Sequence, residues 1–89
     1  MASSNSARKR IRQNATHRAR NRWRLRTMRN AIKEFNQSLA QGSVEQANEA
    51  LRKASQIIDR TAQKGVIHKN QAARRKSRLS ARLKARAAS

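Results

Sequence analysis

The 89-residue sequence has no Cys, no Pro and no Tyr, only two Gly, and a single Trp and a single Phe. Without Cys the chain can form neither a disulfide framework nor a thiolate metal site, which agrees with a reducing compartment. Apart from alanines, no apolar run exceeds two residues, which excludes a signal peptide and a membrane span. We therefore expect a soluble cytoplasmic protein.

Acidic residues are also scarce, since 4 Asp and Glu face 23 Lys and Arg and give a formal charge of +19. Such an excess attracts polyanions and opposes compaction of the isolated chain. Leu, Ile, Val and Phe together number only 13 of 89 residues, so the free chain is expected to be partly folded. The length allows one small domain spanning residues 1–89.

The charge is uneven along the chain. Residues 1–33 hold 11 basic and no acidic groups, and residues 60–89 hold 10 basic and none. All four acidic residues lie in between, with only Arg52 and Lys53 as basic neighbours. The polyanion is therefore expected at two basic arms that flank a nearly neutral centre.

The two glycines divide long stretches of helix-forming residues. Gly42 suits a left-handed position after a helix, and Ser43 followed by Gln46 has the spacing of a capping box. Gly65, followed by the apolar Val66, is typical of a Schellman turn. The sequence predicts three helices, at roughly residues 6–41, 44–64 and 69–87.

Apolar residues recur at helical spacing in each segment. The predicted seams are Leu25, Met28, Ile32, Phe35 and Leu39; Val44, Ala47, Leu51, Ala54 and Ile58; and Ala72, Leu79 and Leu83, with Lys76 at the edge of the third. Short loops join neighbouring helices, so the predicted fold is all-α, an antiparallel three-helix bundle with a long first helix projecting beyond it.

The stretch RNRWRLRTMR, residues 20–29, alternates arginine with other residues as a strand might. The apolar seam that begins at Leu25 has a helical period, and no turn signal separates it from residues 20–24. We therefore expect the whole stretch to be helical. A helix of about 35 residues is about 52 Å long, against about 30 Å for its partners. On a helical wheel the stripe Ile11, Ala15, Ala19 and Trp23 points away from the seam, so the first half of the helix does not extend the core.

Guanidinium groups surround this projecting part. Arg18, Arg22, Arg26, Arg29 and Lys33 share one arc of the wheel, and Arg20 and Arg24 lie on a third side. Such a helix is stable only among anions, as between neighbouring nucleic-acid backbones. On the third helix the arginines instead form a one-sided face, made of Arg74, Arg75, Arg78 and Arg82.

Two single residues have alternative roles. Trp23 is expected to be exposed or to contact RNA rather than to cover apolar surface of the bundle. His68 either caps the third helix or donates a hydrogen bond to phosphate.

Structured RNA fits this pattern best. A helical DNA reader would need a mixed recognition face or a zipper, and an interfacial membrane helix would need a wide apolar face. No nucleophile lies beside a base, no carboxylates are paired and no phosphate loop is present, so no enzyme, cofactor, metal or small-molecule substrate is expected. A nucleoid-type DNA-compacting protein remains the alternative, and a cationic membrane-active peptide is a more distant one.

Three segments, SARKRIRQN (6–14), RNRWRLRTMRNAIKEF (20–35) and above all KGVIHKNQAARRKSRL (64–79), resemble the bacterial small-subunit ribosomal protein S-twenty family. The likeness covers nearly the whole chain. It implies a three-helix bundle in the cytoplasmic ribosome that binds the 5′ domain of small-subunit rRNA early in assembly. The resemblance also implies that the protein lies near the long rRNA helix toward the 3′ end. It also implies contacts with neighbouring subunit components, and neither a membrane nor an obligate homo-oligomer.

The resemblance transfers RNA contact to Ser6, Lys9, Arg10, Arg12, Asn21, Arg22, His68, Lys69, Asn70, Arg74, Arg75, Lys76 and Ser77. Charge and helical position add Arg8, Arg18, Arg20, Trp23, Arg24, Arg26, Arg29, Arg78 and Arg82.

Overall fold

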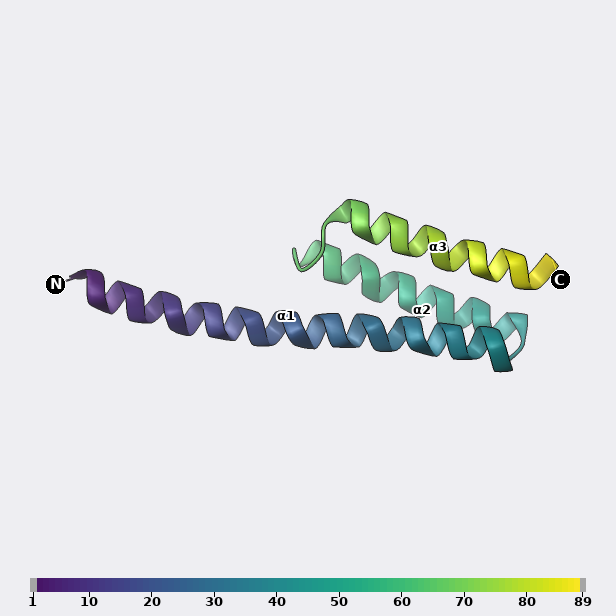
Figure 1. The fold of residues 1–89 in the computed structure, drawn as a ribbon, viewed down its shortest axis with the longest axis horizontal. Coiled ribbons are helices and arrows are strands. Elements are labelled where there is room, and N and C mark those ends of the chain that lie inside the picture. Colours follow the sequence, from purple (N-terminus) through teal and green to yellow (C-terminus); the bar gives the residue numbers. More distant parts are fainter. Residues whose placement is uncertain (1, 89) are drawn as a thin grey trace.

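Three α-helices make up the fold in the computed structural model, which describes residues 2–88. Helix α1 spans Ala2–Gln41, α2 spans Val44–Gln63 and α3 spans Lys69–Ala88, and no strand occurs in this range. Helix α2 runs antiparallel to both α1 and α3 and packs against each of them (Figure 1). The expected all-α architecture with a long first helix is thereby confirmed.

The core is small and is built around α2. Met28 and Phe35 of α1 and Ile58 of α2 are its largest fully buried side chains. The remaining buried apolar residues are Ala31, Ala47, Ala54, Ala72, Leu79 and Leu83. Four of these six are alanines, whose short side chains allow the helices to approach closely and leave little apolar area to bury.

The buried face of α1 is rotated relative to the expected seam. Ala31 is buried, with only 7% of its surface exposed, whereas Leu25 and Ile32 are half-buried at the edge. On α2 the seam begins later than expected, because Val44 is 38% exposed. The seam extends instead to Thr61, whose buried hydroxyl is satisfied because it donates to the carbonyl of Ile57 at 2.7 Å.

The turn between α1 and α2 contains the expected capping box. The Ser43 hydroxyl accepts from the amide of Gln46, and the Gln46 side chain accepts from the amide of Ser43, each at 3.2 Å. The left-handed conformation expected at Gly42 is wrong, since Gly65 is the only residue of the described chain with positive φ. Gly42 is required for a different reason: a Cβ there would collide with Oε1 of Gln46 and approach the carbonyl of Ser38 too closely.

The turn between α2 and α3 is the expected Schellman motif. Gly65, at φ 77°, donates to the carbonyl of Ala62 at 2.9 Å, and Val66 donates to that of Thr61 at 3.1 Å. Helix α3 then begins with His68 as its cap, because its Nδ1 accepts from the amide of Asn70 at 3.1 Å.

Polar contacts attach α3 to both other helices. Arg82 donates from Nη1 to Oδ1 of Asn36 at 3.1 Å, and Arg86 donates from Nε to the carbonyl of Leu39 at 2.9 Å. The ammonium of Lys76 lies 2.8 Å from a carboxylate oxygen of Asp59 on α2. The C-terminal end of α3 is thus held against the end of α1.

Candidate nucleic-acid interface

The N-terminal half of α1 extends beyond α2 and α3 (Figure 1). Every side chain from residue 6 to residue 23 is exposed, and Ile11 and Trp23 are the large apolar residues among them, at 67% and 63%. No acidic residue precedes Glu34 in the sequence. We call residues 6–22 the basic arm. Its guanidinium groups lie on several sides of one helix and are accessible to anions from all of these sides.

The arm carries most of the expected contact residues of α1, each of them exposed: Ser6, Arg8, Lys9, Arg10, Arg12, Arg18, Arg20, Asn21 and Arg22. Beyond it, Arg26 and Arg29 are exposed beside the bundle, and Arg24 is half-buried. These residues form one continuous basic surface along α1.

The four arginines of the expected one-sided face of α3 differ in exposure and in their partners. Arg74 and Arg78 are exposed, whereas Arg82 already donates to Asn36 of α1. Arg75 is half-buried, and its Nε is buried without a hydrogen-bond partner in the described chain. Two of the four arginines are therefore fully available to a ligand, and two lie partly in the bundle.

Further expected residues of α3 also have internal roles. Lys76 pairs with Asp59 across α2 and α3, with 38% and 58% of the two side chains exposed. Such an exposed pair contributes about 0–1 kcal/mol, and an ammonium group has further donors beyond the one that this pair uses. Ser77 is exposed and stays a candidate contact.

The start of α3 shows one of the two roles considered for His68, the helix cap, and its contact with phosphate stays a prediction. Since Nδ1 accepts the hydrogen bond that caps the helix, the neutral ring carries its proton on Nε2. The side chain is exposed, as are Lys69 and Asn70. This group lies at the end of the bundle from which the basic arm projects (Figure 1).

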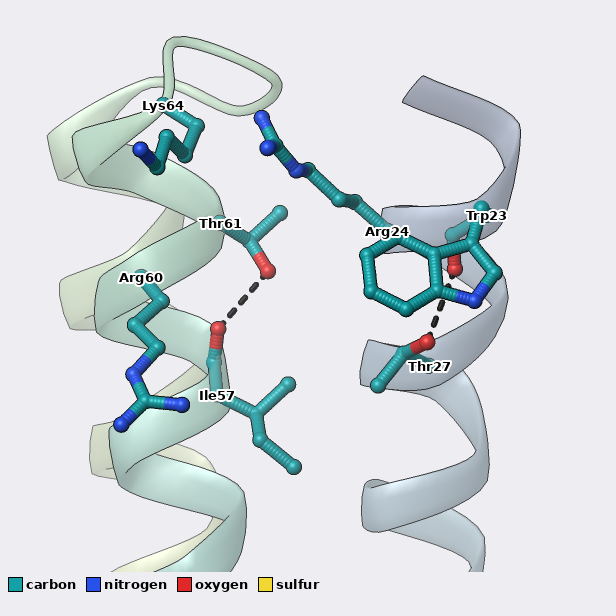
Figure 2. Close-up of a pocket in the computed structure, with 7 residues that line it drawn as sticks. All are labelled: Trp23, Arg24, Thr27, Ile57, Arg60, Thr61 and Lys64. Atoms are coloured by element: carbon teal, nitrogen blue, oxygen red, sulfur yellow. Dashed lines mark hydrogen bonds between the residues drawn. The ribbon is translucent and has the colours of Figure 1, made fainter. Parts of the chain in front are cut away.

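A hollow of about 210 Å³ lies between α1 and α2 where the arm leaves the bundle. Figure 2 shows the indole of Trp23 and the side chain of Ile57 on its two walls. Arg24, Arg60 and Lys64 complete its rim. Sequence analysis missed Arg60 and Lys64, because their proximity to Trp23 depends on how α1 and α2 are aligned along each other.

Within residues 2–88, no group of three or more His, Asp or Glu side chains is placed to hold a metal ion. No helix in this part of the chain is long and apolar enough to cross a membrane.

The family model for ribosomal protein S20 matches residues 2–84. Small ribosomal subunit protein bS20 of Bordetella avium is 49% identical over 85 residues, which cover 96% of this chain and 98% of that protein. The chain belongs to the ribosomal protein S20 family. Other S20 relatives are those of Syntrophobacter fumaroxidans, 48% identical over 96% of this chain and 99% of the relative, and of Halothermothrix orenii, 49% identical over 83% and 85%.

Membership in the S20 family agrees with the resemblance of the three quoted segments. The relatives are bacterial proteins of the small ribosomal subunit, and bacterial ribosomes lie in the cytoplasm. For this S20 chain, the candidate interface consists of the basic arm, the exposed arginines of α3 and the group at the start of α3. The basic arm contains no acidic residue, and on α3 Lys76 pairs with Asp59.

Proposed function

We propose that the chain is a structural constituent of the small ribosomal subunit that binds folded 16S-type rRNA, chiefly its 5′ domain, and stabilises it during assembly. The observation that supports this most strongly is the basic arm, a fully exposed helical segment with cations on several sides and no acidic residue. Family membership supports the same proposal, and we propose no catalytic role.

The arm and α3 are suited to different contacts. A helix with guanidinium groups on several sides neutralises phosphates of more than one backbone, so it fits a crevice between RNA helices. The exposed Arg74 and Arg78 lie on one side of α3 and fit a single backbone. Together they bridge RNA segments that would otherwise repel each other.

Binding is coupled to ordering of the arm in this proposal. An isolated helix with this charge is destabilised by repulsion between neighbouring cations, and phosphates remove that repulsion. The bundle retains its own core and provides a fixed point from which the arm extends. We therefore expect the helix content of the chain to rise when RNA binds.

Competition binding tests the proposed function. The chain is bound to a labelled transcript of the 16S rRNA 5′ domain and challenged with an unrelated folded RNA of equal length and with duplex DNA. We expect the cognate transcript to be retained at a large excess of either competitor. Equal displacement by duplex DNA would favour the alternative, a DNA-compacting protein, because phosphate contacts alone do not distinguish the two polymers.

A further inference from the structure

The hollow between α1 and α2 has apolar walls. Trp23 is 63% exposed, and its ring faces the space opposite Ile57 (Figure 2). The hydroxyls of Thr27 and Thr61 both donate to carbonyls of their own helices, to Trp23 at 2.9 Å and to Ile57 at 2.7 Å. Their hydrogen-bonding capacity is largely used within the chain, so the walls present mainly an aromatic ring and aliphatic groups.

The rim of the hollow is cationic. Arg24 reaches across from α1, Arg60 lies on α2, and Lys64 is the residue directly after α2 (Figure 2). None of the three forms an ion pair within the described residues. Three unneutralised cations around an apolar cavity favour an occupant that has both a flat apolar part and a negative charge.

We propose that this hollow is a seat for one unstacked nucleotide of the bound RNA. Its base lies against Trp23 and Ile57, and its flanking phosphates bind Arg24, Arg60 and Lys64. A nucleotide meets both requirements, because every base has a face that stacks on an aromatic ring and every backbone unit carries a charge. The proposal rests on the proposed binding of rRNA and adds to it a place where the chain binds a base as well as phosphates.

The size and position of the hollow agree with this occupant. A cavity of about 210 Å³ accommodates a flat ring but not a peptide helix. Its lining includes Trp23 and Arg24, the residues that directly follow the basic arm, so RNA bound along the arm would reach the hollow.

Fluorescence of Trp23 gives a direct test, because the chain has one Trp and no Tyr. The full-length chain is titrated with the 16S rRNA 5′-domain transcript and, separately, with inorganic polyphosphate, which has the charge but no bases. We expect strong quenching by the transcript and little by polyphosphate at equal saturation. Equal effects of both probes would overturn the base seat.

Substitution separates stacking from charge. Trp23→Ala is expected to weaken binding of the transcript about 5- to 150-fold, the usual range for the loss of one stacked base, without changing the salt dependence. Trp23→Phe, which keeps an aromatic ring, should retain most of the affinity. Far-UV circular dichroism checks that each variant folds, which is expected because Trp23 lies outside the buried core.

The cations of the rim are tested with a matched control. The double variant Arg60→Gln, Lys64→Gln should reduce the slope of log affinity against log salt by about 1 to 2, one phosphate contact for each cation. The control Arg52→Gln, Lys84→Gln removes the same charge from exposed positions that do not line the hollow. We expect the control variant to change the slope of log affinity against log salt by less than the variant of the rim does.

The outcomes distinguish this inference from the proposed function. If the unaltered chain fails to bind the transcript, the proposed function fails and the seat fails with it. If Trp23→Ala binds as tightly as the unaltered chain, only the proposed nucleotide seat is overturned. The same holds if the two double variants lower the slope of log affinity against log salt equally. Retained affinity of Trp23→Ala is also the result expected if a neighbouring protein occupies the hollow.

Discussion

The arginines of α3 divide according to what their guanidinium groups contact. Arg74 and Arg78 are exposed and have no partner within the described chain, whereas Arg86 donates to the carbonyls of Leu39 and Gly42 at 2.9 and 3.3 Å. Those carbonyls belong to the end of α1, where backbone acceptors lack helical partners and the helix dipole is negative. Arg86 therefore acts as a cap supplied by another helix, although its residue type alone would place it with the RNA-binding arginines.

Replacement of Arg86 is expected to affect folding. Arg86→Ala should lower the free energy of unfolding by about 0.5–1.5 kcal/mol, because two exposed acceptors lose a charged donor. Urea titration of the free chain at moderate salt measures this change. Lys84→Ala removes a similar charge from an exposed side chain on the same helix and is the control. An equal effect of both substitutions would attribute the change to charge alone.

His68 combines a cap with an exposed ring nitrogen, and substitutions can separate the two roles. Asn is among the best N-cap residues, so His68→Asn should preserve the stability of α3, whereas His68→Ala should lower it by about 1 kcal/mol. Both variants lose the ring proton on Nε2 and should bind the rRNA transcript more weakly. Thermal unfolding and filter binding give the two readouts. Full affinity in His68→Asn would assign His68 to capping only.

At the scale of elements, both turns depend on one glycine each, but for different reasons. Gly65 has φ 77°, and no atom lies within 4 Å of the position a Cβ would take. Glycine is therefore required at position 65 for its backbone conformation and not for lack of space. Gly65→Ala should lower the free energy of unfolding by about 1–2 kcal/mol, the cost of a left-handed L-residue, as measured by urea titration.

A matched variant distinguishes this cause from crowding. Gly65→Asn should be less damaging than Gly65→Ala, although Asn is larger, because Asn adopts the left-handed region more readily. The reverse order would mean that space, rather than backbone conformation, decides the requirement.

Local signals allowed most of the helix ends to be predicted from the sequence. The capping box of Ser43 and Gln46 and the Schellman turn at Gly65 each depend on residues within six positions of one another. Burial of Ala31 and Thr61 depends instead on how α1 and α2 cross. The spacing of the large apolar residues does not predict how far the buried face of each helix is rotated from the expected seam. Small residues decide where two helices approach most closely.

In the candidate site, too, some features could be predicted from the sequence and others depend on how the helices pack. The exposed arginines of the arm follow from charge and periodicity, since no neighbour is needed to leave them exposed. Arg60 and Lys64 line the same hollow as Trp23 only after α1 and α2 are aligned, and Arg82 donates to Asn36 only after α3 has folded against α1. Sequence alone therefore indicates which residues carry charge, and the packing of the helices decides which of them remain available.

At the scale of the whole molecule, the bundle and the basic arm are energetically separate. The buried core begins at Met28, and no side chain of residues 6–22 is even half-buried. The molecule measures 67 Å along its longest axis and 22 and 13 Å across, so the arm increases its length without enlarging its core. Stability should therefore depend on residues 23–88 and RNA affinity on both parts.

Deletion of residues 1–19 tests this separation. At high salt the free energy of unfolding should stay within about 0.5 kcal/mol, because residues 6–19 are all exposed, and at low salt it should rise slightly as self-repulsion falls. The deletion removes Arg8, Lys9, Arg10, Arg12 and Arg18, so the slope of log affinity for the rRNA transcript against log salt should fall by about 2 to 4.

Each part of the result has one interpretation. A large loss of stability at high salt would mean that the arm packs against the bundle. An unchanged salt slope would mean that the arm does not contact phosphates. A chain with glutamine at those five basic positions keeps the length of the arm and is the control. If the glutamine chain and the deletion lower the slope of log affinity against log salt by the same amount, the arm contributes to binding through its charge. If the arm acted only by filling space, the glutamine chain would bind like the unaltered chain.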